Sequence, residues 1–244
     1  MSVVFITGGA RRIGRRLAER FAANGWSVGV TYNASVSEME SLKNQLDGAG
    51  IHSAFSQCDV AKEDQLRSSL DVLREHLGPP DVIVSNAGIF PDPKPIASTT
   101  PQDVLDAIAV NTLPLLIIAR WLHAQLASSD QVRRLVAITS LGAVELWKDR
   151  LPYNVSKSAV QTMAYSLSRS LAPHIAVNSV APGAIVMREE PSDSDTAVTT
   201  VERIPMKRYG SADDVFDAVH YFATCSPYIT GQLIMVDGGY HRVR

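Results

Sequence analysis

Three polar residues in the second half of the chain have types and spacing suited to acid–base chemistry. Tyr153 and Lys157 are four residues apart, which places both side chains on one face of a helix. A free tyrosine has a pKa of about 10, and a neighbouring positive charge would lower it. Ser140 ends an apolar run, where its hydroxyl can donate a hydrogen bond to a substrate oxygen. A lone Tyr-x-x-x-Lys pattern often occurs by chance on a protein surface without any function. This interpretation therefore depends on a second motif.

The second motif is a glycine-rich turn, T-G-G-A-R-R-I-G, that runs from Thr7 to Gly14. It follows a short apolar run and precedes an amphipathic stretch that ends at Asn24-Gly25. Glycine lets the backbone approach a pyrophosphate, and a helix N-terminus supplies free N–H groups and partial positive charge. The turn therefore predicts a dinucleotide site whose contacts include Gly8, Arg11, Arg12, Ile13 and Gly14.

Arg12 stands where a related fingerprint has a glycine. It can pair with a phosphate, or Arg11 and Arg12 can be solvated surface charges. Arg15 and Arg16 follow closely, and we interpret the four arginines together as a local anion site in a chain whose net charge is only -2.

The end of the second apolar run indicates which dinucleotide is bound. A site for NAD would place a carboxylate there for the ribose 2′-hydroxyl, but the segment reads Thr31-Tyr32-Asn33-Ala34-Ser35. Asn33 and Ser35 can donate hydrogen bonds to the extra phosphate of NADP, and Arg11 can supply charge. We expect NADP(H), with NAD(H) in a tolerant pocket as the alternative. The positive ring of the oxidised cofactor would also favour the phenolate of Tyr153.

Short β-branched runs alternate with longer amphipathic ones, as in a parallel sheet covered by helices. Expected strands are Val3–Thr7, Ser27–Thr31, Ser53–Gln57, Val82–Ser85, Arg134–Thr139, Ala176–Val180 and Leu233–Val236. Expected helices follow Gly14 and cover Glu38–Leu46, Lys62–His76, Gln102–Leu126, Pro152–Leu171 and Ser211–Thr224. No linker divides them. We predict an α/β protein in which residues 1–244 form one doubly wound, seven-stranded parallel sheet with helices on both faces, a Rossmann fold.

Composition excludes several classes of protein. The chain has 23 Lys+Arg against 25 Asp+Glu, so nucleic acid is not an expected partner. Cys58 and Cys225 stand alone, without a metal-binding spacing, and the N-terminus has no features of a targeting signal. The longest apolar stretch, Leu113–Ala119, is too short to span a membrane. We expect a cytoplasmic protein without a metal or a membrane partner.

The chain as a whole resembles the short-chain dehydrogenase/reductase family. The resemblance rests on motifs that fall in the family order at family spacings: Thr7–Gly14, Asp59-Val60, Ser85-Asn86-Ala87-Gly88, Asn111, Ser140, Tyr153, Lys157, Pro182-Gly183, Ile229–Gln232 and Val236–Gly239. It implies hydride transfer to or from a nicotinamide. Tyr153 would be the acid–base, Lys157 would lower its pKa and hold the ribose, Ser140 would polarise the substrate oxygen and Asn111 would hold a relay water. Asn111 could instead only cap or kink its helix.

The same resemblance extends the cofactor site beyond the glycine turn. It implies contacts from residues that follow the third, fourth and sixth strands, namely Asp59, Val60, Asn86, Ala87, Gly88, Pro182, Gly183 and Ile185, together with Tyr153 and Lys157. Asp59 could instead only start a turn.

Three details are similar to the pteridine reductase and dihydromonapterin reductase branch of the family. These are Arg12, the aromatic Phe90 and the C-terminal stretch Gly238–Arg244. Phe90 can stack on a flat substrate ring or pack under its own loop. Ser140 departs from the branch, which commonly has aspartate there; serine is typical of carbonyl-reducing members such as 3-oxoacyl-carrier-protein reductases. A dihydropterin is therefore one candidate substrate, and a small ketone or alcohol is the other.

Further expectations concern a non-enzymatic role, a lid and assembly. A binding sensor without activity is disfavoured because Tyr153 and Lys157 are both present. Residues 184–203 are polar and acidic, and we expect a substrate lid there, with an ordinary loop as the alternative. The 113–118 stretch and the helix after Tyr153 are apolar on more than one face. Together with the resemblance, this predicts a homotetramer.

Overall fold

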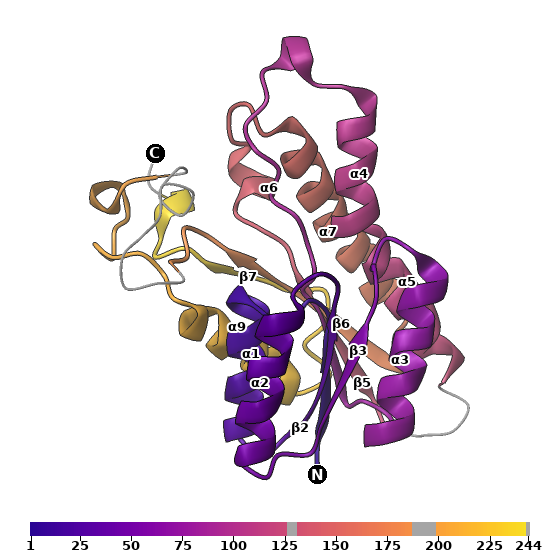
Figure 1. Cartoon of the computed structure of the whole chain (residues 1–244). Helices are drawn as coiled ribbons and strands as arrows, with labels where there is room; N and C mark the ends of the chain where they lie inside the picture. The colour runs from indigo at the N-terminus through magenta and orange to yellow at the C-terminus, as the bar shows by residue number, and fades with distance from the viewer. Residues whose placement is uncertain (126–130, 187–198, 243–244) are drawn as a thin grey trace.

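All seven predicted strands form one parallel sheet in the computed structural model, which describes residues 1–125, 131–186 and 199–242 (Figure 1). The sheet order is β3-β2-β1-β4-β5-β6-β7. The strands are β1 (Val3–Ile6), β2 (Ser27–Tyr32), β3 (Ser53–Gln57), β4 (Val82–Ser85), β5 (Arg133–Ile138), β6 (Ile175–Pro182) and β7 (Leu233–Val236). The order reverses between β1 and β4, so the predicted doubly wound Rossmann fold is confirmed.

Helices cover both faces of the sheet. One face carries α1 (Arg12–Ala23), α2 (Val36–Gly48) and α9 (Ala212–Thr224). The other carries α3 (Glu63–Leu77), α4 (Pro101–Asn111), α5 (Leu113–Ala124) and α7 (Leu151–Ser170). The short α6 (Gly142–Glu145) and the 3₁₀ turns η1 (Ile96–Ser98), η3 (Val201–Arg203) and η4 (Tyr240–Arg242) lie in the connections.

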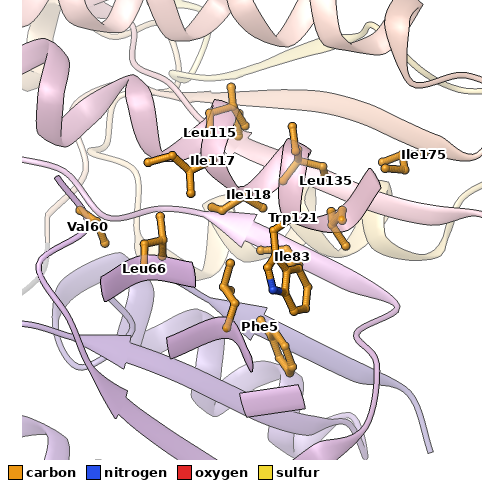
Figure 2. Close-up of a cluster of buried hydrophobic side chains, with 14 of the residues drawn as sticks. Phe5, Val60, Leu66, Ile83, Leu115, Ile117, Ile118, Trp121, Leu135 and Ile175 are labelled. Atoms are coloured by element: carbon orange, nitrogen blue, oxygen red, sulfur yellow. The ribbon is translucent and has the colours of Figure 1, made fainter. Parts of the chain in front are cut away.

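Strand side chains alternate between two cores. Val4 and Ile6 pack with α1, α2 and α9, whereas Phe5 packs on the opposite face, as the two-residue period of a strand requires. Figure 2 shows Phe5 beside Trp121, with ring centres 6.5 Å apart. Each large side chain buried in this way stabilises the fold by roughly 1.5–3 kcal/mol. The two cores hold the helices against both faces of the sheet.

The predicted helix Gln102–Leu126 is wrong as a single element. It is interrupted at Thr112, which separates α4 from α5. Pro114 has no N–H to donate to a carbonyl of the preceding turn. The Thr112 hydroxyl donates to the carbonyl of Ser156 in α7, at 2.9 Å, and so ties the interruption to that helix. The interruption leaves Asn111 as the last residue of α4, and its side chain bonds to Ile89 in the segment after β4.

By length and apolar composition alone, residues 101–124 would be sufficient to cross a membrane. Half of their most apolar window is nevertheless buried inside the protein. Leu115 and Ile118 have no exposed surface and Trp121 has 2%. The stretch therefore has the packing of a core helix.

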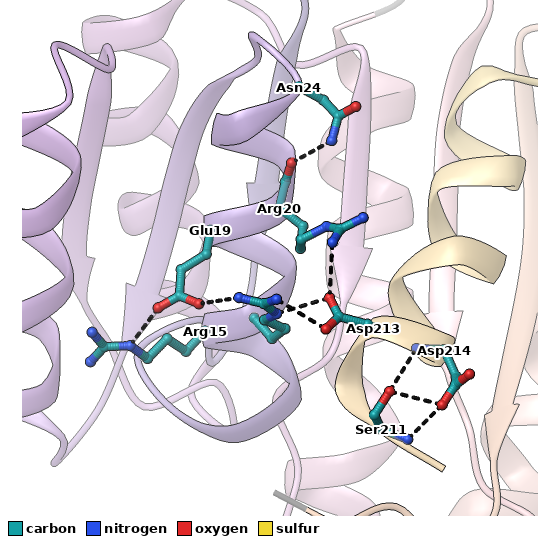
Figure 3. A network of polar contacts seen from close by, with 8 residues as sticks. Arg15, Glu19, Arg20, Asn24, Ser211, Asp213 and Asp214 are labelled. Atoms are coloured by element: carbon teal, nitrogen blue, oxygen red, sulfur yellow. Dashed lines mark hydrogen bonds and ion pairs between the residues drawn. The ribbon is translucent and has the colours of Figure 1, made fainter.

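An ion-pair network joins α1 to α9 (Figure 3). Arg16 donates to Asp213 through two nitrogens, each at 2.9 Å, and Arg20 lies 3.3 Å from the same carboxylate. Arg15 pairs with Glu19 at 2.9 Å. The interpretation of four arginines as one anion site is therefore too broad, because Arg15 and Arg16 are engaged in helix contacts.

The predicted lid, residues 184–203, lies largely outside the described residues, which omit 187–198. Its described start is fixed to the chain that follows it. Gly210 donates to the carbonyl of Ala184 at 3.0 Å, and Val186 donates to that of Gly210 at 2.9 Å. The lid remains a prediction.

Candidate active site

A cleft of about 590 Å³ opens at the carboxyl ends of the strands, where β1 and β4 diverge. Every residue predicted to contact the cofactor lines it: Gly8, Arg11, Arg12, Ile13, Gly14, Asn33, Ser35, Asp59, Val60, Asn86, Ala87, Gly88, Tyr153, Lys157, Pro182, Gly183 and Ile185. The predicted substrate residues Phe90 and Ser140 line the same cleft. Asn111 does not appear on its wall.

The glycine turn forms one end of the cleft and admits no side chain at two positions. A Cβ on Gly14 would lie 2.3 Å from the carbonyl oxygen of Gly8, and one on Gly8 would lie 2.9 Å from the Cα of Ala87. Thr7 fixes the turn, because its hydroxyl accepts hydrogen bonds from the backbone N–H groups of Asn86 and Ala87, both at 3.0 Å. The ends of β1 and β4 are therefore held at a set separation, with backbone facing the cleft. This is the geometry that a pyrophosphate needs.

Arg12 adopts a left-handed backbone conformation with φ of 52°. A residue with a Cβ loses about 1–2 kcal/mol there relative to the right-handed region, which explains why a glycine fits the related fingerprint. The arginine side chain is exposed and lines the cleft. A strained non-glycine residue at a ligand-facing turn is typical of a functional position.

The predicted 2′-phosphate site brings together Arg11, Asn33 and Ser35, and it also contains a carboxylate that the sequence reasoning missed. Glu38, in the first turn of α2, lines the same part of the cleft. Its pKa is lowered by its backbone N–H, the Ser37 hydroxyl and the charges of Arg11 and Arg15. The available signal was its position about one helical turn after Ser35.

Tyr153 and Lys157 lie at the opposite end of the cleft, in the first two turns of α7. The Lys157 ammonium donates to the carbonyl of Ile138 at 3.0 Å and lies 6.0 Å from the centre of the Tyr153 ring. Burial lowers the pKa of Lys157 to about 8. Ser140 follows β5, where its hydroxyl accepts from the Gly142 N–H at 3.0 Å. The structure thus brings the three predicted groups into one site.

Burial raises the pKa of Tyr153 to about 12, against the lowering effects of the Ser140 hydroxyl and the Arg150 charge. Lys157, which we expected to lower that pKa, directs its ammonium group to a backbone carbonyl instead. At neutral pH the phenol is therefore protonated and able to donate a proton.

Asn111 is 4% exposed and its side chain is occupied by protein partners. Its oxygen accepts from the Ile89 N–H at 2.7 Å, and its nitrogen donates to the Ile89 carbonyl at 3.1 Å and to the Ser156 hydroxyl at 2.9 Å. Asn111 thereby ties the segment after β4 to α7. A proton-relay role for Asn111 remains a prediction. The observed contacts show a structural role beside Gly88, where an added Cβ would lie 2.9 Å from the Asn111 side-chain oxygen.

Two residues that the sequence reasoning missed, Trp147 and Arg150, lie at the substrate end. Trp147 lines the cleft parallel to Tyr153, with ring centres 5.9 Å apart. Phe90 contacts Tyr153 edge-on at 4.6 Å, and the guanidinium of Arg150 lies over the Phe90 ring at 4.0 Å. The available signal was the three-residue spacing of Trp147, Arg150 and Tyr153. That spacing alone is not a recognisable motif, and it gains meaning only once the fold is known.

A doubly wound parallel sheet whose cleft carries a glycine turn at one end and Tyr, Lys and Ser at the other defines a class of nicotinamide-dependent oxidoreductases. A family model described as enoyl-(acyl carrier protein) reductase matches residues 8–241. The chain belongs to the short-chain dehydrogenase/reductase family, and it is an oxidoreductase of that family.

Curated relatives include the 3-oxoacyl-[acyl-carrier-protein] reductase FabG of Staphylococcus epidermidis, 31% identical over 238 residues and 96% of each chain. The 3-oxoacyl-[acyl-carrier-protein] reductase of Rattus norvegicus is 30% identical over 97% of each chain. Among solved structures, FolM alternative dihydrofolate reductase 1 from Brucella canis, complexed with NADP, has a TM-score of 0.88 at 28% identity, covering 100% of this chain and 95% of that one. A blue fluorescent protein from a metagenomic library, in complex with NADPH, has a TM-score of 0.87 at 30% identity, covering 98% and 97%.

Proposed function

We propose that this protein is an NADPH-dependent reductase of a small flat heterocycle of the dihydropterin type. The observation that carries the proposal is the aromatic wall of Phe90 and Trp147 beside Tyr153. Aromatic rings favour flat, polarisable substrates through offset or edge-on contacts. The similarity to FolM alternative dihydrofolate reductase 1 supports the same substrate class.

The glycine turn and the residues after β2 bind the cofactor in this proposal. The turn and the start of α1 accept the pyrophosphate, while Arg11, Asn33 and Ser35 bind the 2′-phosphate. Arg11 lies near enough to Glu38 to lower its pKa, and the Ser37 hydroxyl donates to Glu38 at 3.0 Å. These contacts keep Glu38 ionised, and the charge of Arg11 partly offsets the repulsion that this carboxylate exerts on a phosphate. The NADP and NADPH complexes of the similar solved structures support NADP(H) over NAD(H).

Tyr153 donates the proton, and Lys157 and Ser140 prepare it for transfer. When bound, the cofactor supplies a hydride to the substrate. Because the pKa of Tyr153 is about 12, the phenol is in the proton-donating form required for reduction at neutral pH. Lys157, with a pKa of about 8, still carries charge at that pH and stabilises the phenolate that forms. Ser140 orients the substrate atom that receives the proton, and Asn111 holds the segment that carries Phe90.

A second candidate is reduction of a 3-oxoacyl thioester. Ser140, rather than aspartate, favours it, as do the 3-oxoacyl-[acyl-carrier-protein] reductases of similar sequence. A serine hydroxyl is suited to orienting a ketone oxygen. The two candidates share the cofactor and the proton donor and differ only at the substrate end.

NADPH oxidation by the purified protein, measured with dihydrobiopterin and with acetoacetyl-coenzyme A, separates the candidates. We expect turnover of the dihydropterin that requires Tyr153. Rapid turnover of the thioester with none of any pterin would overturn the first candidate and support the second. Cofactor binding without turnover of any pterin or carbonyl compound would indicate a binding sensor instead.

We also propose that the protein is a homotetramer. Apolar side chains remain exposed along α4, α5 and α7, at Leu105, Leu113, Leu116, Val155 and Tyr165. Exposed apolar surface spread over neighbouring helices is typical of a face covered by another subunit. Size-exclusion chromatography with light scattering tests this, and a stable monomer at micromolar concentration would contradict it.

Two remaining features of the chain complete the proposal. Residues 1–244 act as one catalytic domain, and the 184–203 segment, most of which lies outside the described residues, serves as the substrate lid. The two cysteines are unpaired, with Cys58 buried and Cys225 half-buried, which suits a reducing compartment such as the cytoplasm. Limited proteolysis with and without NADPH tests the lid, since cofactor binding should protect that segment.

A further inference from the structure

Arg150 is a buried cation next to the proposed proton donor. It is 8% exposed and is the N-cap residue of α7, so its carbonyl accepts the first helical hydrogen bond, from Asn154 at 2.9 Å. Its guanidinium donates to the carbonyl of Pro91 and lies 4.0 Å from the centre of the Phe90 ring. Among the described residues it forms no ion pair, and Asp92 acts on it only through longer-range attraction. A buried charge kept without a carboxylate partner costs stability, so its presence points to a role other than stabilising the fold.

The segment that presents Arg150 is strained. Leu146 and Asp149 both have left-handed backbones, with φ of 51° and 56°. Each such residue costs about 1 kcal/mol or more. The segment is held to the chain after β4 by the Lys94 N–H, which donates to the Asp149 carbonyl at 2.7 Å. Two strained residues in five, on either side of Trp147, are consistent with a segment shaped for a site rather than for stability alone.

Arg150 does not line the cleft, whereas Phe90, Trp147 and Tyr153 do. It therefore reaches a bound substrate only through these rings. A guanidinium stacked on an aromatic face fixes the plane of that ring and adds attraction to its packing. The same charge acts directly on Tyr153, since Arg150 and Tyr153 each shift the other through their Coulomb interaction. Arg150 thus has one contact that can position a ring and one that can tune a proton.

We propose that Arg150 is a positioning residue of the reductase site: it holds the Phe90 ring against Tyr153 for a flat substrate and provides a fixed positive charge beside the phenol. The proposal rests on the proposed function for its substrate. The Ser140 hydroxyl after β5 and the Arg150 charge before α7 both lower the pKa of the phenol. Lys157, on the same helix as Tyr153, lies 6.0 Å from the ring centre, and Asp92 attracts Arg150. Of these, Arg150 combines charge with contact to the aromatic wall.

Two substitutions separate the roles. Arg150→Met removes both the positive charge and the planar guanidinium that stacks on Phe90. Arg150→Lys keeps the charge but loses the planar group. Arg169→Met, on an exposed part of α7, is the matched control. With NADPH and dihydrobiopterin, we expect kcat/KM to fall roughly tenfold in Arg150→Met. The alkaline limb of its pH profile should move up by about one pH unit or less, because loss of a nearby cation raises the pKa of the phenol. In Arg150→Lys we expect a raised KM for the pterin and an unchanged alkaline limb.

A titration that needs no substrate keeps the inference separate from the proposed function. Tyrosinate absorbance is titrated in the presence of NADP⁺ for each Arg150 variant and for the same variant carrying Tyr153→Phe. The difference between the two curves reports the ionisation of the Tyr153 phenol. We expect its apparent pKa to rise in Arg150→Met and not in Arg150→Lys. If no pterin is reduced but this shift is seen, the substrate assignment fails and the electrostatic role stands.

Equal losses in both variants, with no change of the pH limb or of the titration, would show a merely structural role and overturn the proposal. So would kinetic constants equal to those of Arg169→Met. If Arg150→Met does not fold, Arg150→Lys decides alone: a KM for the pterin like that of the control contradicts the positioning role.

Discussion

At the proposed phosphate end of the cleft, formed by the glycine turn, backbone atoms line the wall, whereas at the proposed substrate end side chains from three separate segments pack around Tyr153. Gly8 and Gly14 are required at the first end because a Cβ would strike the carbonyl or Cα of a neighbouring turn. The second end is formed by Phe90 after β4, Ser140 after β5, and Trp147 and Arg150 before α7. We therefore expect cofactor binding to depend on close backbone approach, and substrate choice to depend on a small set of stacked side chains that can vary without changing the fold.

The largest effect is expected from filling the phosphate end. In Gly14→Ala the new Cβ lies 2.3 Å from the Gly8 carbonyl and 2.6 Å from the Asn86 side chain, so the turn must shift. We expect the Kd for NADPH to rise at least about tenfold and stability to fall by about 1–3 kcal/mol. Fluorescence titration with NADPH and urea unfolding measure both.

Gly48→Ala is the matched control for this substitution, because nothing lies within 4 Å of the position. It should leave cofactor affinity unchanged and stabilise α2 slightly. Equal NADPH affinity in both alanine variants would show that the turn does not bind the pyrophosphate.

At the substrate end, the buried Lys157 and Tyr153 should make the free energy of unfolding depend on pH. The folded chain releases the Lys157 proton at a pKa of about 8 and the unfolded chain at 10.5, so in between the unfolded state binds more protons and the free energy of unfolding rises with pH. The gain is on the order of 3 kcal/mol. Tyr153 acts oppositely: its pKa rises from 10.0 to about 12, so stability falls across that range.

Urea unfolding at several pH values between 7 and 11 tests this prediction. Lys157→Met should remove the rise, and Tyr153→Phe should remove the fall at the alkaline end. A wild-type stability that is flat in pH, or a rise that survives in Lys157→Met, would mean that Lys157 is not a desolvated ammonium in the folded protein.

A smaller effect of mixed sign is expected at Arg12. Arg12→Gly relieves the left-handed strain, so stability should rise by about 1 kcal/mol or less. The same change removes a cation from the cleft wall and should weaken NADPH binding by roughly tenfold. A variant that is both less stable and equally tight for NADPH would show that Arg12 serves the fold and not the cofactor. Thermal unfolding with and without NADPH gives both values.

The smallest effect is expected outside both ends, in the network between α1 and α9. Asp213→Asn removes the partner of Arg16 and Arg20, but all three side chains are about 40% exposed, with values of 42%, 41% and 38%. Surface ion pairs of this kind contribute roughly 0–1 kcal/mol. We expect a loss of stability within that range and unchanged NADPH affinity. A large loss of affinity would mean that α1 is oriented by this network rather than by the core.

The sequence was sufficient to predict what depends on local pattern. The strands follow the two-residue alternation of Val4, Phe5 and Ile6, and the glycine turn leaves a direct mark because only glycine fits it. All predicted residues of the cofactor site lie on one cleft, since the carboxyl ends of parallel strands meet at one edge.

Contacts between distant segments could not be read from the sequence. The interruption at Thr112 depends on a hydroxyl contact to α7 as well as on Pro114. Trp147 and Arg150 become part of the site only because a strained segment folds back against the chain after β4. Arg15 and Arg16 looked like anion ligands by proximity, but the helix turns them toward Glu19 and Asp213.

In the proposed reaction, Tyr153 donates the proton in an NADPH-dependent reduction at the aromatic end of the cleft. Single-turnover oxidation of NADPH by dihydrobiopterin, followed in the wild type and in Tyr153→Phe, tests it most directly. We predict that Tyr153→Phe binds NADPH as tightly as the wild type and is slower by about 100-fold or more. A Tyr153→Phe enzyme that reduces the pterin at the wild-type rate would contradict the account.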